Sequence, residues 1–328
     1  MSLKHGVFTV SLDFEMYWGV RDKRSIAQYR DNLLGVSRAI PAMLRLFGAN
    51  GIHATWATVG FIFFKDADEL RQHLPASLPT YGSANLSPYD YMADAPGLEA
   101  DYHFAPALIE QIAATEGQEI ATHTFSHYYC LEDGQTLAQF KDDIGAAIGV
   151  AARKGFSVKS LVFPRNQWNG QYLSALAELG VRCYRGNESN WMYKASNGDG
   201  QSRLQRAARL VDTYFNLSGH NTHALADCTR EAPYNFAASR FLRPYSEKLG
   251  VLEGLRLRRI KNAMRDAAVN KRIFHLWWHP HNFGVNLQSN MAFLERVIAY
   301  QAVLRREHGM LSLNMGELCQ LAGGADGQ

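Results

Sequence analysis

Short apolar runs alternate with longer segments of helical periodicity along most of the chain. Residues 6–12 (GVFTVSL) and 272–278 (RIFHLWW) have the composition of strands that are buried on both faces. Residues 31–47 repeat apolar side chains at intervals of three and four, which predicts a helix ending near Gly48 and Gly51. Since strands and helices alternate, we expect parallel strand pairing with helices covering the sheet.

Weaker patterns extend this alternation over the whole chain. They predict strands at 52–59, 119–122, 160–163, 181–184, 210–215 and 310–313, and helices at 108–114, 137–154, 170–179, 251–272 and 292–306. So many repeats favour a barrel or a long open sheet within one domain, residues 1–322. We interpret the irregular stretches 65–103 and 187–244 as long insertions over the functional face, and residues 323–328 as a disordered tail.

The composition of the 328 residues is that of an ordinary globular protein, with 47% hydrophobic and 20% charged residues. A net charge of +3 gives no reason to expect a nucleic-acid partner. No apolar run reaches the ~18 residues of a membrane helix, and Asp13 and Glu15 interrupt the first apolar run too early for a signal peptide. Four widely spaced cysteines indicate reduced thiols, so we expect a cytoplasmic protein.

Two acids, Asp13 and Glu15, directly follow the first predicted strand. In extended backbone, positions i and i+2 point the same way, so both carboxylates are expected to face one site with Phe14 in the wall. Two like charges this close require a cation or strong hydrogen-bond donors. The alternative is a pair of solvated surface acids at a strand end.

Basic and imidazole side chains follow three other predicted strands. His123 and His127 are four residues apart, a spacing at which two imidazoles can bind one metal ion. Arg165 comes after residues 160–163, and its guanidinium could hold a carboxylate such as Asp13 in place. Each of these residues alone could equally be an ordinary surface or core residue.

The last of these strand ends carries three histidines at alternate positions. His275 lies inside the predicted strand 272–278 and is expected to be a hydrogen-bonded core residue, whereas His279 at its end is the better catalytic candidate, with His281 as the alternative. Because parallel strands end at one rim, acid, histidine and arginine side chains after four strands are expected to converge.

The motifs SLDFE, ATWATVG, HTFSH, FPRNQ and LWWHPHNFG, in this order, resemble those of the NodB-homology polysaccharide deacetylases, carbohydrate esterase family 4. The resemblance covers most of Val7 to Gly284. It implies an α/β fold, a distorted (β/α) barrel of about seven parallel strands with long loop insertions.

The resemblance also implies a set of catalytic roles. Glu15, His123 and His127 would bind one divalent metal ion, and two imidazoles with one carboxylate suit Zn²⁺ best. Asp13, held by Arg165, would be the general base, and His279 the general acid.

This chain departs from the family pattern at three points. Phe14 stands where the family has the second of two adjacent aspartates, so the roles of Asp13 and Glu15 could be exchanged. Pro164 precedes Arg165, and the usual tyrosine whose backbone N–H helps to bind the oxyanion is not identifiable. Nearby Asn166 and Gln167 remain candidates for substrate binding, and Glu188 and Asp212 for the acid that orients the late histidine.

By resemblance, the expected reaction is removal of an N-acyl group, acetyl or formyl, from an amino sugar in surface-polysaccharide or lipopolysaccharide assembly. The candidate sugar-stacking residues are Trp18, Trp191, Trp277 and Trp278. One alternative is hydrolysis of a non-sugar amide, as in allantoinase-like relatives. Another is a carbohydrate-binding barrel without catalytic activity, which the altered first motif would suggest.

A basic segment suggests where the protein acts. Residues 243–272 hold nine basic and three acidic residues, a net charge of +6, on a predicted helix with an apolar stripe. Such a helix could lie on the inner face of the membrane, close to a lipid-linked substrate. The alternative is that the stripe packs on the barrel and the basic residues are solvated.

Overall fold

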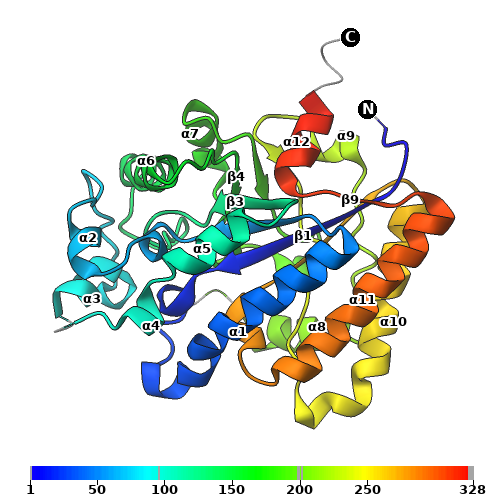
Figure 1. The fold of residues 1–328 in the computed structure, drawn as a ribbon. Coiled ribbons are helices and arrows are strands. Elements are labelled where there is room, and N and C mark those ends of the chain that lie inside the picture. Colours follow the sequence, from blue (N-terminus) through cyan, green and yellow to red (C-terminus); the bar gives the residue numbers. More distant parts are fainter. Residues whose placement is uncertain (1, 95–96, 198–199, 201, 324–328) are drawn as a thin grey trace.

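A single nine-stranded sheet organises the fold (Figure 1). The computed structural model of the protein describes residues 2–94, 97–197, 200 and 202–323. The strands are β1 (Val7–Phe14), β2 (Ala54–Thr58), β3 (Gln118–Thr122), β4 (Ser160–Val162), β5 (Cys183–Arg185), β6 (Tyr234–Asn235), β7 (Arg240–Phe241), β8 (Ile273–Trp278) and β9 (Leu311–Ser312). Each ladder between these strands is parallel, as the alternating pattern predicts.

Helices surround this sheet and connect most of its strands. They are α1 (Ile26–Asn50), α2 (Ala67–Arg71), α3 (Pro88–Asp94), α4 (Ala100–His103), α5 (Pro106–Ala113), α6 (Leu137–Arg153), α7 (Leu173–Glu178), α8 (Arg203–Asp212), α9 (Leu225–Cys228), α10 (Glu253–Val269), α11 (Leu287–His308) and α12 (Met315–Gly323). Short 3₁₀ turns follow several strand ends, among them η1 (Met16–Gly19), η2 (Gly60–Phe63), η4 (Pro164–Asn166) and η8 (Pro280–Phe283).

The sheet closes into a barrel through one short segment. Its strand order is β6-β5-β4-β3-β2-β1-β8-β7, with β9 attached to β1, so β6 and β7 are the two edges. Only residues 236–239 separate these edges in sequence, and they bridge them. Phe236 N–H donates to Tyr184 O (3.0 Å), and Ser239 N–H donates to His275 O (2.9 Å). Counting β6 and β7 as one interrupted strand gives seven around the barrel, which confirms the predicted fold class.

Most predicted elements are present, with two corrections in the second irregular stretch. Residues 210–215 are not a strand, because the first three of them end α8, whose start is fixed by a capping box between Ser202 and Gln205. Residues 234–241, within the predicted insertion, supply β6 and β7, which are two residues each and too short for an alternating pattern. Gly323 ends α12, and the rest of the predicted tail lies outside the described residues.

Strand β1 gives the barrel a polar interior. Its even-numbered side chains, Phe8 to Phe14, belong to the apolar cluster beneath the outer helices. Alternation therefore turns the odd-numbered Ser11 and Asp13 inward, where both contact Arg185. All eight residues of β1 are buried, as expected for a central parallel strand.

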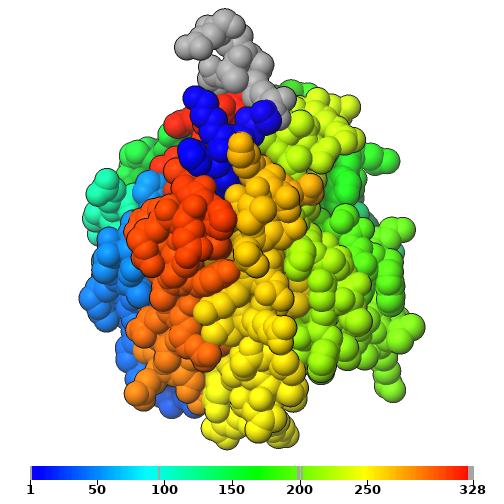
Figure 2. All heavy atoms as spheres, turned by 90° about the vertical axis from the view of Figure 1, so that its right-hand side faces the viewer, coloured from blue at the N-terminus to red at the C-terminus, as the bar shows by residue number. Residues whose placement is uncertain are grey.

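Helix α10 packs beside α11 on the outer surface (Figure 2). Its apolar stripe, Leu257 to Ala267, is buried in the main core rather than exposed. Arg256 and Arg259 on this helix are also buried, the first over the Phe293 ring (3.7 Å). The structure thus favours the packing alternative for the stripe. Among the helices of the described residues, none is both long and apolar enough to cross a membrane.

Candidate active site

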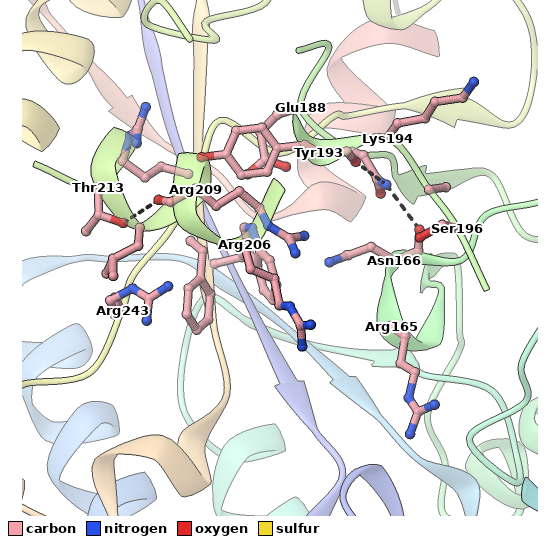
Figure 3. Close-up of a pocket in the computed structure, with 16 residues that line it drawn as sticks. Arg165, Asn166, Glu188, Tyr193, Lys194, Ser196, Arg206, Arg209, Thr213 and Arg243 are labelled. Carbon is pink, nitrogen blue, oxygen red and sulfur yellow. Dashed lines mark hydrogen bonds between the residues drawn. The ribbon is translucent and has the colours of Figure 1, made fainter. Parts of the chain in front are cut away.

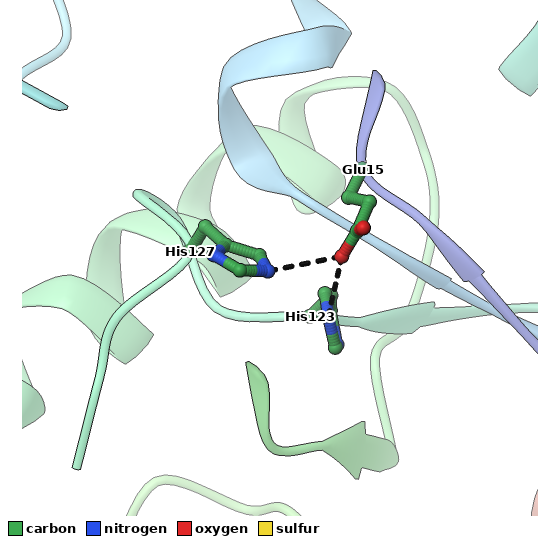
Figure 4. Close-up of side chains that lie close together, drawn as sticks. All are labelled: Glu15, His123 and His127. Atoms are coloured by element: carbon green, nitrogen blue, oxygen red, sulfur yellow. Dashed lines mark hydrogen bonds and ion pairs between the residues drawn. The ribbon is translucent and has the colours of Figure 1, made fainter. Parts of the chain in front are cut away.

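Glu15, His123 and His127 converge at the carboxyl ends of β1 and β3 (Figure 4). Glu15 Oε2 lies 2.9 Å from His127 Nε2 and 3.3 Å from His123 Nε2. One ligand atom from each residue lies within 4.8 Å of the others, and all three residues are buried. Asp13, the other acid of the first motif, is buried as well, so neither carboxylate is a solvated surface group.

The chemistry of this cluster fits a divalent cation. His123 Nδ1 donates a hydrogen bond to Val162 O (2.8 Å), which orients the ring so that Nε2 faces Glu15 and His127. Nε2 is buried and has no hydrogen-bond partner among the described residues. A lone pair that faces a carboxylate and a second imidazole in a buried site is typical of a metal ligand.

Backbone geometry around Glu15 fixes its carboxylate. Met16, directly after it, has a positive φ of 49°, which turns the chain into η1. Gly19 at the end of η1 lies so close that a Cβ there would overlap the Glu15 carboxylate. Any larger residue at position 19 would thus have to displace the Glu15 carboxylate.

The loop that carries both histidines is held by a buried acid. Asp143 on α6 accepts hydrogen bonds from the backbone N–H of Phe125 (2.7 Å) and of Ser126 (3.1 Å). Thr124 and His127 both have positive φ, 64° and 59°, a costly conformation for residues other than glycine. These bonds to Asp143 offset the cost and keep the loop in the shape that the two histidines need.

Asp13 is held by Arg185, the last residue of β5. The two side chains form a bidentate ion pair, with Nη1–Oδ1 at 2.7 Å and Nη2–Oδ2 at 2.8 Å, and both are buried. Ser11 Oγ accepts from Arg185 Nη1 (2.9 Å) and donates to His275 Nε2 (2.8 Å). His275 Nδ1 donates to Phe236 O, so His275 is the hydrogen-bonded core residue that its position predicts.

The expectation that Arg165 holds Asp13 is wrong. Arg165 forms an ion pair with Asp22 instead and lies over the Tyr129 ring at 4.4 Å. The physical reason is the turn η4, in which Arg165 has a left-handed φ of 54° and leaves the direction of its strand. Arg185 takes the role predicted for Arg165.

The two residues after Arg165, Asn166 and Gln167, have different contacts. Asn166 Oδ1 accepts from Arg185 Nη2 (3.0 Å), so Asn166 lies beside the site. Gln167 is buried and instead holds a neighbouring loop, through Leu131 N–H (3.3 Å) and Glu132 Oε1 (2.7 Å). Substrate contact therefore remains a proposal for Asn166 and is not supported for Gln167.

His279 reaches both carboxylates from the end of β8. Its Nε2 lies 3.8 Å from Asp13 Oδ2 and 3.7 Å from Glu15 Oε1, and its side chain is 22% exposed. The side chain of His281 is only 4% exposed, with Nε2 3.9 Å from Glu15 Oε1. Asn282 faces Nδ1 of His279 at 3.4 Å. It therefore lies where the sequence analysis expected Glu188 or Asp212 to orient this histidine.

Asp212 and Glu188 have other environments. Asp212 forms an ion pair with Arg240 (3.1 Å) and accepts hydrogen bonds from Ser218. Glu188 is buried, and Arg240 and Arg185 are its cationic neighbours. Neither acid orients His279 in the described residues.

The electrostatics keep both carboxylates ionised. Burial alone would raise the pKa of Asp13, but Arg185 and then His123 lower it below its ordinary value. Burial likewise raises the pKa of Glu15, and His279, His123 and His127 outweigh it and bring the pKa well below normal. Burial lowers the pKa of His127 to about 4 despite Glu15, so this imidazole is neutral and able to bind a metal.

The four candidate stacking tryptophans differ in accessibility. Trp18 and Trp278 are fully buried, and Trp18 Nε1 donates to His103 O (2.8 Å), so a sugar-stacking role is wrong for these two. Trp277 lies under the Arg185 guanidinium (4.2 Å) and lines a cavity beside the site. Trp191 is 54% exposed.

Sequence reasoning missed Arg185, Asp143 and Gly19. Arg185 directly follows the predicted strand 181–184, so the rule used for the other strand ends would have found it. Asp143 lies mid-helix and Gly19 in a turn, and neither position carries a pattern that points to a site.

Comparison with solved structures supports the fold. A candidate polysaccharide deacetylase from Mycobacterium smegmatis matches with a TM-score of 0.61 at 13% identity, over 98% of this chain and 92% of that one. One from Pseudomonas aeruginosa matches with a TM-score of 0.56 at 11% identity, over 96% and 89%. An allantoinase matches with a TM-score of 0.52 at 12% identity, also over 96% and 89%.

These likenesses are of the fold. No protein-family profile matches the sequence, and no curated protein matches it. The barrel expected from the motif resemblance is also the fold of the two candidate deacetylases. Because an allantoinase has the same fold, the fold alone does not specify the reaction. The reaction has to be argued from the side chains of the site.

Gly19→Ala should weaken metal binding, because the new Cβ displaces the Glu15 carboxylate. We expect zinc affinity to fall by about 10- to 100-fold, the usual effect of disturbing the surroundings of a metal ligand. A competition titration with a chromophoric chelator measures it. Gly48→Ala, where the added Cβ meets no atom within 4 Å, is the matched control. Equal affinities in the two variants would contradict this role for Gly19.

Arg185→Lys should reduce turnover by about 10²-fold while zinc is retained, because a single ammonium cannot reproduce the bidentate pair that aligns Asp13. The same substitution at Arg165 should cost less, because its partner is Asp22. Turnover rates, with thermal melting to verify folding, compare the two. A larger loss for Arg165→Lys would restore the original assignment.

Proposed function

We propose that this protein is a metal-dependent hydrolase that removes an N-acyl group, most simply acetyl, from an amino sugar. The proposal rests on the surroundings of two neighbouring carboxylates, Glu15 and Asp13, whose negative charges are offset by different partners. Glu15 lies with two imidazoles in a cation site, and Asp13 lies in a bidentate pair with Arg185 beside it. The sugar substrate is supported by the motif resemblance.

Glu15, His123 and His127 would hold the divalent ion, for which Zn²⁺ is the best match. When bound, such an ion polarises the acyl carbonyl and makes a water molecule more acidic. Glu15 lies with the two imidazoles, whereas Asp13 is paired with Arg185. This arrangement favours Glu15 as the metal ligand and Asp13 as the general base.

Asp13 takes the proton of the attacking water. Its carboxylate is available for this because Arg185 holds it ionised and oriented. As the water oxygen bonds to the acyl carbon, the carbon–nitrogen bond has to break, and an amine leaves readily only after it is protonated.

His279 supplies that proton. Asn282 lies 3.4 Å from Nδ1 of His279 and so orients the ring with Nε2 toward the two carboxylates, and the protonated form of the ring gives up its Nε2 proton to the leaving amine. Nε2 faces both Asp13 and Glu15 at under 4 Å, so the acid and the base serve the same reacting group. His279 is also the more exposed of the two neighbouring histidines, which suits contact with a substrate.

The pathway and location remain proposals. We place the substrate in surface-polysaccharide or lipopolysaccharide assembly, in the cytoplasm, on the basis of the motif resemblance and the cysteine pattern. Weak attachment to the inner face of the membrane would now depend on exposed basic residues such as Arg258 and Arg265, since the apolar stripe of α10 is buried. Trp277 and Trp191 are the aromatic residues left for sugar contact.

Hydrolysis of a non-sugar amide is the second candidate, and the fold shared with an allantoinase favours it. The chemistry at the scissile amide would be the same. A carbohydrate-binding barrel without activity is less well supported, because the acid, the base and the ligand set all lie within reach of one another.

Asp13→Asn and Glu15→Ala should separate chemistry from metal binding. Asp13→Asn removes the base and should cut the rate of deacetylation by ~10²-fold or more with zinc retained. Glu15→Ala removes a ligand and should lose zinc and activity together. Elemental analysis beside rates on a panel of N-acetylated amino sugars measures both. Full zinc occupancy in Glu15→Ala would exchange the two roles.

His279→Ala should lower turnover by about 10²-fold, because it removes the proposed proton donor to the leaving amine. His281→Ala is the matched control at the next alternate position, where the imidazole is nearly closed to solvent. Turnover of both variants on the same N-acetylated amino sugar, with zinc content determined in parallel, is the measurement. A silent His279→Ala beside a damaging His281→Ala would identify the other histidine as the acid.

A further inference from the structure

A cavity of about 480 Å³ opens beside the candidate active site (Figure 3). Its walls come from η4, from the 187–196 segment, from α8 and from the residues around β7. The volume falls in the range typical of ligand pockets. Neither the metal cluster nor the acid and base assigned above lies in its wall, so the cavity has a role still to be explained.

The cavity adjoins the reacting groups through shared side chains. Asn166 lines it and accepts from Arg185, the partner of Asp13. Phe241 also lines it, and its ring lies 5.9 Å from that of His279. A substrate with its acyl group at Asp13 and His279 would therefore extend into this cavity.

The wall is strongly basic. Among its described residues, six are cationic and one, Glu188, is acidic. The cationic residues are Arg165, Lys194, Arg206, Arg209, Arg240 and Arg243. Arg206 and Arg209 lie on α8, with Arg243 beside that helix and Arg165 on η4 (Figure 3).

Arg240 and Arg243, two of the residues that line the cavity, have buried donors without partners in the described part of the chain. Its side chain is 3% exposed, and Nη1 is bound by Asp212 (3.1 Å). Its Nε and Nη2 have no hydrogen-bond partner among the described residues, and neither has Arg243 Nε. Buried guanidinium donors without acceptors are costly, and a ligand with several oxygens would satisfy them.

The electrostatics of the wall agree with this geometry. Burial raises the pKa of Glu188, and Arg240 and Arg185 act against this effect. Burial also lowers the pKa of Arg209, and Arg243 and Arg206 lower it further, against the effect of Tyr193 and Glu188. Arg206, Arg209 and Arg243 therefore repel one another, and an anion bound among them would reduce this repulsion.

We infer that the N-acyl sugar carries a phosphate ester and that Arg206, Arg240 and Arg243 bind it. The inference rests on the proposed function and specifies its substrate. Guanidinium groups match phosphate oxygens bidentately, and several of them around one cavity suit a phosphate or diphosphate better than a single carboxylate. The phosphate would belong to a nucleotide or to a lipid carrier of the sugar.

Inorganic pyrophosphate is the probe that tests the pocket, measured by calorimetry on EDTA-treated protein so that neither metal nor turnover is involved. We expect saturable binding to the wild type, weakened at least 10-fold by Arg206→Ala and by Arg243→Gln. Arg206 is exposed, so its replacement leaves the core intact. Arg203→Ala, one turn earlier on α8 and outside the cavity, is the matched control and should bind as the wild type does.

Competition then identifies the source of the phosphate. Displacement of pyrophosphate by UDP-N-acetylglucosamine supports a nucleotide-linked sugar, and displacement by farnesyl diphosphate alone supports a lipid-linked one. Absence of pyrophosphate binding, or binding unchanged in both Arg206→Ala and Arg243→Gln, overturns the inference. Hydrolysis of neutral N-acyl sugars by a protein that binds no pyrophosphate would keep the proposed function and remove only the phosphate.

Discussion

The carboxylates of Asp13 and Glu15, at the carboxyl end of β1, both have to stay ionised inside the barrel. Asp13 and Glu15 are both buried, and bringing two like charges out of water is unfavourable unless each has its own counter-charge. The structure meets this constraint from opposite sides, with Arg185 bound to Asp13 and two imidazoles facing Glu15. A cation bound at Glu15 would offset the remaining negative charge. The same geometry therefore accounts both for the charge balance and for the different roles of Asp13 as base and Glu15 as metal ligand.

The polar interior of the barrel connects this pair to the fold. A row of hydrogen bonds runs from Asp13 through Arg185 and Ser11 to His275, and His275 in turn binds the segment between β6 and β7. That segment is what joins the two edges of the sheet. Closure of the barrel and orientation of the candidate base therefore depend on one continuous network, in which each polar atom of His275 and Ser11 has a partner.

Periodicity was sufficient for a parallel α/β sheet and for the strand ends that carry Asp13, Glu15, His123, His127 and His279, and the motif resemblance then distinguished a barrel from a long open sheet. These are local properties, because the alternation of β1 and the ends of β3 and β8 are visible within a few residues of sequence.

The rest depended on distant contacts. Whether Arg165 or Arg185 reaches Asp13 is decided by a left-handed turn at η4, and positive φ at a residue other than glycine has no sequence pattern. Edge strands of two residues and the burial of Trp18 and Trp278 are likewise set by tertiary packing. The basic residues of the cavity come from four separate parts of the chain, so its charge excess is diluted in sequence among residues 165–243.

Anomalous diffraction at the zinc absorption edge, from crystals of the zinc-loaded protein, tests the central claim most directly. The account predicts one peak bounded by Glu15, His123 and His127 at ~2.0–2.2 Å from their N and O atoms, with Asp13 still paired to Arg185. A peak coordinated by Asp13, with the Asp13–Arg185 pair broken, would contradict it.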